Sequence, residues 1–215
     1  GRGSVYRFRR PGGQKHRETS VSHVPVLLVP SMLHQWYVLD LCEGSSVVAA
    51  LSTNTPWETF CFDWGVPEDE DRYVEWDHIV GRLERAVRFV QRTTGAPKVA
   101  LVGYSMGGPV TQLLARRHPE RVAGFVLCAT ALDWSDPRQK VFWRTMGGLR
   151  LLLGLFPRGA WQTGMRLAGA PSKEIDWVAS ELSRGSARDL AEAGRELGRF
   201  DSSGWVAELP QPRSV

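Results

Sequence analysis

Short apolar runs recur along the chain, separated by longer stretches with a helical pattern. Within each run nearly every residue is apolar, so both faces of a strand formed by the run are apolar. Strands of this kind are covered on both sides, as in a parallel sheet. We therefore predict four buried strands, at residues 24–29, 59–62, 98–102 and 122–129.

The segments between these runs predict helices. Apolar residues recur at close to 3.6-residue spacing over residues 76–90, and Gly95 is expected to end that helix. A second helix is expected over residues 106–117, before Pro119. Because strands alternate with helices, we predict an α/β fold, a mostly parallel sheet with helices on both faces.

The last third of the chain has a different pattern. Residues 134–204 contain helix-like stretches and no convincing strand, and strand-like sequence returns only at residues 212–215. The excursion is longer than usual loops, so we predict a helical lid there, with ordinary packing helices as the alternative. The expected domains are a core (1–133), a lid (134–204) and a return to the core (205–215), where the chain is expected to stop short of its last strands.

Composition adds few constraints. The chain is 42% hydrophobic, and its net charge of +4 comes from basic residues spread over the whole sequence among 23 acidic ones, so we expect no nucleic-acid partner. Near the N-terminus, Tyr6 and Phe8 alternate with arginines, which predicts a half-exposed strand. No apolar stretch approaches the roughly 20 residues of a transmembrane helix.

Cysteine usage points to a reducing compartment. Cys42, Cys61 and Cys128 are an odd number and lack metal-ligand spacing. We expect reduced thiols in a cytoplasmic protein, with no metal and no cofactor.

The strongest chemical signal is Gly-Tyr-Ser-Met-Gly at residues 103–107, after a predicted strand and before a predicted helix. This is the pattern of a nucleophile elbow, in which a strained turn presents a serine hydroxyl above the sheet. Small residues are needed two positions either side, and Gly103 and Gly107 supply them. Ser105 is thus the predicted nucleophile, and the Met106 amide, at the helix N-terminus, is a predicted oxyanion donor.

A second loop follows the first buried strand. In such sites an amide from this loop completes the oxyanion hole. We predict Met32 as that donor, with Ser31 as the next choice. Ser31, His34 and Tyr104 are expected to contact the substrate.

Taken in order, these motifs resemble the polyhydroxyalkanoate synthase branch of the α/β-hydrolases, over roughly residues 24–137. The resemblance implies acyl chemistry through a covalent acyl-enzyme, with cysteine in the synthases at the position of Ser105. Since serine is the usual nucleophile of esterases in this fold, Ser105 favours hydrolysis. The residues that carry the resemblance are Val29-Pro30-Ser31-Met32, Tyr37-Val38-Leu39-Asp40-Leu41, Asp63-Trp64-Gly65 with Pro67, Glu68 and Asp69, Gly103-Tyr104-Ser105-Met106-Gly107-Gly108 and Leu132-Asp133-Trp134-Ser135-Asp136-Pro137.

The rest of a catalytic triad is harder to place. In this fold the acid and then the histidine follow the serine. His118 is the only later histidine, and we expect it at the surface, far along the helix. His34 is a minor alternative for the base. Asp133 is a minor alternative for the acid, although it could simply cap a helix or order a turn. We expect the true pair after residue 215, and this chain alone to be inactive.

The leading interpretation is a serine-dependent hydrolase of carboxylic acyl esters, with a small-molecule ester as its partner. One alternative is an acyltransferase or polymer-forming enzyme, as the resemblance allows. Another is a non-catalytic binding protein on a hydrolase scaffold. The acyl group and the oligomeric state are left open by the sequence.

Overall fold

The computed structural model describes residues 3–8, 24–32, 35–42, 44–65, 75–134, 157–167, 175–176, 179–180 and 197–214. The chain divides into two compact units. Gly1–Ala131 and Ser202–Val215 form the first unit, and Leu132–Asp201 form the second. That the second unit is a lid stays a prediction.

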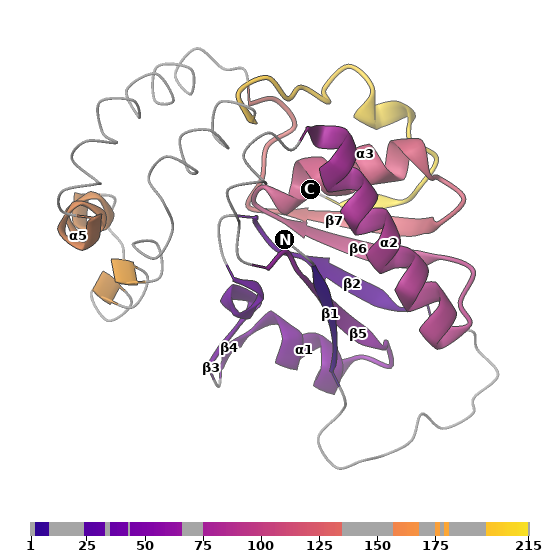
Figure 1. The fold of residues 1–215 in the computed structure, drawn as a ribbon, viewed down its shortest axis with the longest axis horizontal. Helices are drawn as coiled ribbons and strands as arrows, with labels where there is room; N and C mark the ends of the chain where they lie inside the picture. Colours follow the sequence, from indigo (N-terminus) through magenta and orange to yellow (C-terminus); the bar gives the residue numbers. More distant parts are fainter. Residues whose placement is uncertain are drawn as a thin grey trace. The chain divides into compact units, whose positions relative to one another are not determined.

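A six-stranded sheet forms the centre of the first unit (Figure 1). Its edge strand β1 is antiparallel to β5, while every other neighbouring pair is parallel, so the predicted mostly parallel sheet is confirmed. The parallel order β5-β2-β6-β7 brings the carboxyl ends of these strands to one edge. In spatial order the strands are β1 (Ser4–Phe8), β5 (Thr59–Asp63), β2 (Val26–Val29), β6 (Val99–Tyr104), β7 (Val122–Cys128) and β8 (Arg213–Ser214).

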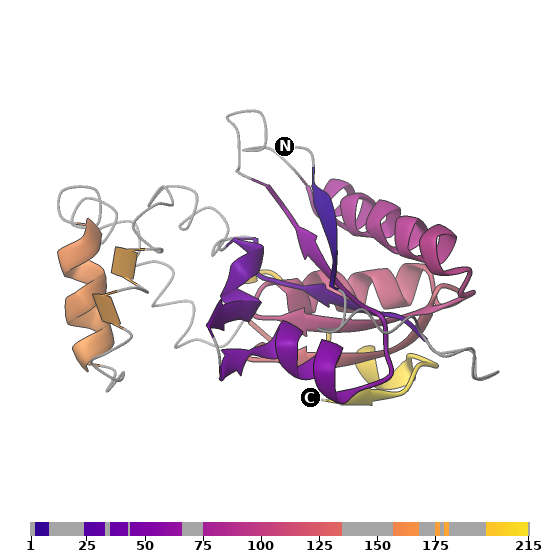
Figure 2. The same cartoon turned by 90° about the horizontal axis from the view of Figure 1, so that it is seen from below.

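Helices cover both faces of this sheet. The helices α2 (Trp76–Thr94) and α3 (Gly107–Arg117) lie on one face, and α1 (Val47–Asn54) lies on the other (Figure 2). As predicted, α2 ends at Gly95, whose φ of 73° is the left-handed conformation that favours glycine. The buried stripe of α2 consists of Val80, Leu83, Ala86, Val87 and Val90.

Helix α1 was not predicted, and its sequence explains why. It carries no regular apolar stripe, and only Val48 and Ser52 are buried. Its start depends on a cap, since the Ser46 hydroxyl accepts a hydrogen bond from the Ala49 amide at 2.7 Å. This helix is therefore stabilised by its cap and its packing, and not by an amphipathic pattern. Other unpredicted elements are the 3-10 turns η1 (Trp36–Leu39) and η3 (Val206–Glu208), and the small sheet of β3 (Asp40–Cys42) and β4 (Ser45–Ser46).

The core on the α1 face contains a cysteine. Cys61 is fully buried among Val26, Leu28, Leu39 and Val48. Burial, with smaller contributions from nearby carboxylates, raises the pKa of its thiol to about 12, so the thiol stays protonated and unreactive. Cys61 and the half-buried Cys128 are free thiols, as predicted, and the side chain of Cys42 lies outside the described residues.

In the second unit, two segments far apart in the sequence are paired by their backbones. Asp133 forms an antiparallel bridge with Asp201, and the Trp134 amide donates to the Phe200 carbonyl at 3.1 Å. The unit also contains the helix α5 (Pro157–Leu167). Over the described ranges of both units, no helix is both long and apolar enough to span a bilayer.

Candidate active site

Ser105 lies in the turn between β6 and α3, in a conformation that few non-glycine residues adopt. Its φ is 52°, in the left-handed region. Two backbone hydrogen bonds hold it there: its amide donates to the Cys128 carbonyl at 2.9 Å, and its carbonyl accepts from the Gly108 amide at 3.0 Å. The strained residue is thus fixed between the neighbouring strand and the first turn of the helix.

The glycines around this turn are required by close backbone contacts. A Cβ on Gly107 would lie 2.0 Å from the Val29 carbonyl oxygen and 2.8 Å from that of Pro30. A Cβ on Gly103 would lie 2.8 Å from the Cα of Gly108. The steric requirement inferred from the sequence is therefore present in the structure.

The two backbone amides predicted as oxyanion donors belong to Met106 and Met32. Met106, 3% exposed, stands at the N-terminus of α3, where no acidic residue occupies the first turn. Within the described part of the chain, the amides of Met106 and Met32 donate to no acceptor. A Cβ on Gly107 would meet the Pro30 carbonyl oxygen at 2.8 Å, so the two loops run close together. A helix N-terminus such as that of α3 favours negative charge.

A tryptophan from another strand end reaches this loop. The indole Nε1 of Trp64 donates to the Pro30 carbonyl at 2.8 Å, and Trp64 is 5% exposed. Trp64 follows β5 in a turn closed by the Gly65 amide, which donates to Asp63 Oδ1 at 3.0 Å. In the sequence, Asp63-Trp64-Gly65 contributes to the family resemblance, but no sequence signal indicated that the indole of Trp64 binds the second loop.

The predicted substrate contacts have different surroundings. Ser31 is fully buried, and Met32 is half-buried. Tyr104 is half-buried and packs on the α1-face cluster around Leu28 and Leu39. His34 lies outside the described residues.

His118 is not brought to Ser105. It caps the far end of α3, an 11-residue helix, so about 16 Å of helix separates the two at 1.5 Å per residue. Its Nε2 lies 3.7 Å from Glu84 Oε2, and its Nδ1 lies 3.5 Å from Glu120 Oε1. As expected, His118 lies away from the serine turn, and its side chain is 29% exposed beside these two carboxylates. Asp133, the alternative acid, belongs to the second unit.

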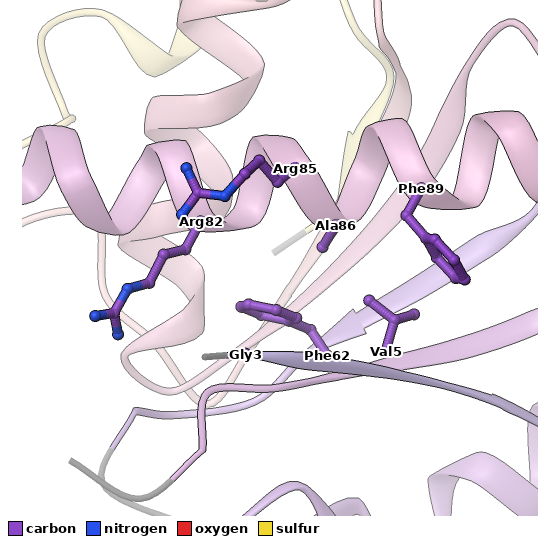
Figure 3. Close-up of a pocket in the computed structure, with 7 residues that line it drawn as sticks. All are labelled: Gly3, Val5, Phe62, Arg82, Arg85, Ala86 and Phe89. Carbon is purple, nitrogen blue, oxygen red and sulfur yellow. The ribbon is translucent and has the colours of Figure 1, made fainter. Parts of the chain in front are cut away.

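A separate cavity of about 430 Å³ lies between α2 and the strands β1 and β5 (Figure 3). Two arginines of α2 flank an otherwise apolar lining, and its described residues include no nucleophile and no general base. None of the lining residues belongs to the turn around Ser105. They are Gly3, Val5, Phe62, Arg82, Arg85, Ala86 and Phe89.

A strand, a strained serine turn and a helix are thus joined as an α/β-hydrolase requires, and a family comparison agrees. The family model described as alpha/beta hydrolase fold matches residues 24–189, well over half of the chain. The chain belongs to the α/β-hydrolase fold family.

Solved structures of hydrolases share this fold. A hydrolase from Oleispira antarctica superposes with a TM-score of 0.67 at 13% identity, covering 99% of this chain and 75% of that one. A thermophilic esterase from Thermogutta terrifontis gives a TM-score of 0.65 at 16% identity, covering 98% of this chain and 72% of the esterase. At such identities the likeness concerns the fold alone.

Sequence relatives confirm the predicted resemblance to polyhydroxyalkanoate synthases. Poly(3-hydroxyalkanoate) polymerase subunit PhaC of Allochromatium vinosum is 30% identical over 134 residues, which are 62% of this chain and 36% of the relative. The Haloferax mediterranei protein of the same name is 32% identical over 114 residues, covering 53% and 23%. The chain therefore spans only about a third or less of the length of these relatives.

Proposed function

We propose that this α/β-hydrolase uses Ser105 to cleave carboxylic acyl esters through an acyl-enzyme. The observation that carries the proposal is the conformation of Ser105, a non-glycine residue held at a φ of 52° by hydrogen bonds to β7 and α3. Such strain persists only where the surroundings over-determine it, and it is concentrated at functional sites.

In the proposed reaction, Ser105 Oγ forms a bond to the acyl carbon while its proton passes to a general base. The amides of Met106 and Met32 stabilise the oxyanion, and the alcohol leaves with the proton from the base. Water then attacks the acyl-enzyme, which releases the carboxylic acid and restores the serine. We assign the general base to a histidine outside the described residues. Contacts of Ser31, His34 and Tyr104 with the substrate, and a lid formed by the second unit, are further parts of this proposal.

Acyl transfer to a growing polymer is the second candidate, and the 30–32% identity to the PhaC subunits favours it. Both reactions pass through an acyl-enzyme, so they differ in the acceptor. Serine forms an oxygen ester, a poorer acyl donor than the thioester of a cysteine, so Ser105 favours water as the acceptor.

A direct test supplies the full-length protein with a 3-hydroxyacyl-CoA and follows free CoA and polymer together. The proposal predicts CoA release without polymer, and Ser105→Ala abolishes the release. Polymer formed by the unaltered protein would establish the second candidate instead. If the unaltered protein binds the acyl-CoA but neither releases CoA nor forms polymer, it is a binding protein.

A further inference from the structure

We infer that Trp64 is a positioning residue for the oxyanion loop, acting through its indole hydrogen bond to the Pro30 carbonyl. The inference rests on the proposed function, because the loop matters only if Met32 or Ser31 donates to an oxyanion. Trp64 itself touches no reacting atom in this assignment.

The bond fixes the direction of a backbone amide. The peptide group between Pro30 and Ser31 is planar, and in the trans form its N–H points opposite to its carbonyl. All described peptide bonds are trans, so a carbonyl held by the indole at 2.8 Å turns the Ser31 amide away from Trp64. The Met32 amide follows one residue later, at the start of the turn.

The same carbonyl is confined from a second side. A Cβ on Gly107 would lie only 2.8 Å from the Pro30 oxygen, so the backbone beside Ser105 runs close to this oxygen. The peptide is therefore held between the nucleophile turn and the Trp64 indole. Of these two contacts, only the indole supplies a directional hydrogen bond.

The indole is itself held rigidly. The ring of Phe62 packs edge-on against it, with centroids 4.6 Å apart and planes at 71°. Gly3 of the edge-strand segment leaves room for Phe62, since a Cβ there would lie 2.7 Å from Phe62 Cζ (Figure 3). Gly65, at a φ of 76°, turns the chain directly after Trp64. A donor fixed in this way keeps the loop arranged before substrate binds.

The test replaces Trp64 by Phe, which keeps an aromatic ring and removes the N–H. We expect kcat for a p-nitrophenyl ester to fall about tenfold while KM changes less than about twofold, because the loop stabilises charge that appears only in the transition state. Affinity for an acyl trifluoromethyl ketone, which forms an oxyanion on Ser105, should fall by a similar factor. Affinity for an uncharged amide analogue of the substrate should not change.

Phe60→Leu is the matched control, since Phe60 is a fully buried aromatic residue on β5, the strand that Trp64 follows, and has no donor to lose. Equal effects of Trp64→Phe and Phe60→Leu on kcat, or equal weakening of both inhibitors, would overturn the assignment. If Trp64→Phe does not fold, the benzothiophene analogue of tryptophan at position 64 removes the N–H with nearly the same shape. Esterase activity that survives Ser105→Ala would contradict the proposed function itself, and the role of Trp64 would then lose its basis.

Discussion

Single residues decide whether the turn around Ser105 can form. At Gly107 the atoms that an added Cβ would meet are backbone atoms of Val29 and Pro30, which cannot move aside as flexible side chains do. Two glycines with opposite surroundings make this testable, Gly107 in the turn and Gly81 on α2.

We expect Gly107→Ala to lower the free energy of unfolding by about 3 kcal/mol, because its Cβ would lie 2.0 Å from the Val29 carbonyl oxygen. On Gly81 the nearest atom to a Cβ is 3.8 Å away, at the end of the flexible Arg85 side chain. Gly81→Ala should therefore stabilise the protein by roughly 0.5–1 kcal/mol, the usual helix preference of alanine over glycine. Urea titrations of both variants measure the two effects, and a tolerated Gly107→Ala would refute the packing argument.

The left-handed conformation of Ser105 has its own consequence. Ser105→Ala and Ser105→Gly both remove the hydroxyl, but only glycine relieves the strain of a φ of 52°. We expect both variants to be inactive and the glycine variant to be at least as stable as the alanine variant in thermal unfolding. A clearly less stable Ser105→Gly would mean that position 105 is not strained in the folded protein.

At this scale the sequence predicted Ser105, the glycines and Met106, because strand, turn and helix are local in the chain. It did not predict the role inferred for Trp64, whose partner lies 34 residues earlier. Nothing about residues 63–65 alone shows where the indole points.

At the scale of elements, an ionic cluster joins α2 to the end of α3. Arg88 donates to Glu84 from Nε at 2.9 Å and from a terminal nitrogen at 2.6 Å, while His118 and Arg121 approach the same carboxylate at 3.7 and 3.8 Å. The hydrogen bond from Arg88, with these charges, lowers the pKa of Glu84.

A lowered folded-state pKa means that Glu84 stabilises the fold above its unfolded value near 4.5, and that this contribution is lost as the pH falls through the folded value. Glu84→Gln should therefore cost up to about 1 kcal/mol at neutral pH and nothing in strong acid. Urea titrations across the acid range measure this difference. Glu120→Gln is the control, since Glu120 is 60% exposed and should show little pH-dependent effect. A pH-independent loss in Glu84→Gln would show that its charge is not the cause.

Elements with strong periodicity were predicted well, and those without it were missed. The apolar spacing of residues 76–90 and the stop at Gly95 predicted α2 almost to its observed bounds. Helix α1 escaped prediction because its capping by Ser46 and its packing, not its pattern, stabilise it.

At the scale of the whole molecule, alternation of strands and helices was enough to predict an α/β fold with a mostly parallel sheet, and the motif around Ser105 with the family resemblance added the α/β-hydrolase assignment. The sheet order could not be derived, because it depends on long-range crossovers such as the placement of β1 beside β5. The second unit, Leu132–Asp201, corresponds to the region where the strand-like runs stop and helix-like stretches follow. Local sequence pattern cannot predict whether this unit serves the site.

The central claim is that Ser105 is an activated nucleophile. The most direct measurement treats the full-length protein with a fluorophosphonate probe and maps the modified residue by mass spectrometry. The account predicts labelling at Ser105, lost in Ser105→Ala, because it assigns the activated hydroxyl and the oxyanion donors to this turn. Absence of labelling at Ser105, or equal labelling of the Ser105→Ala variant, would contradict the account.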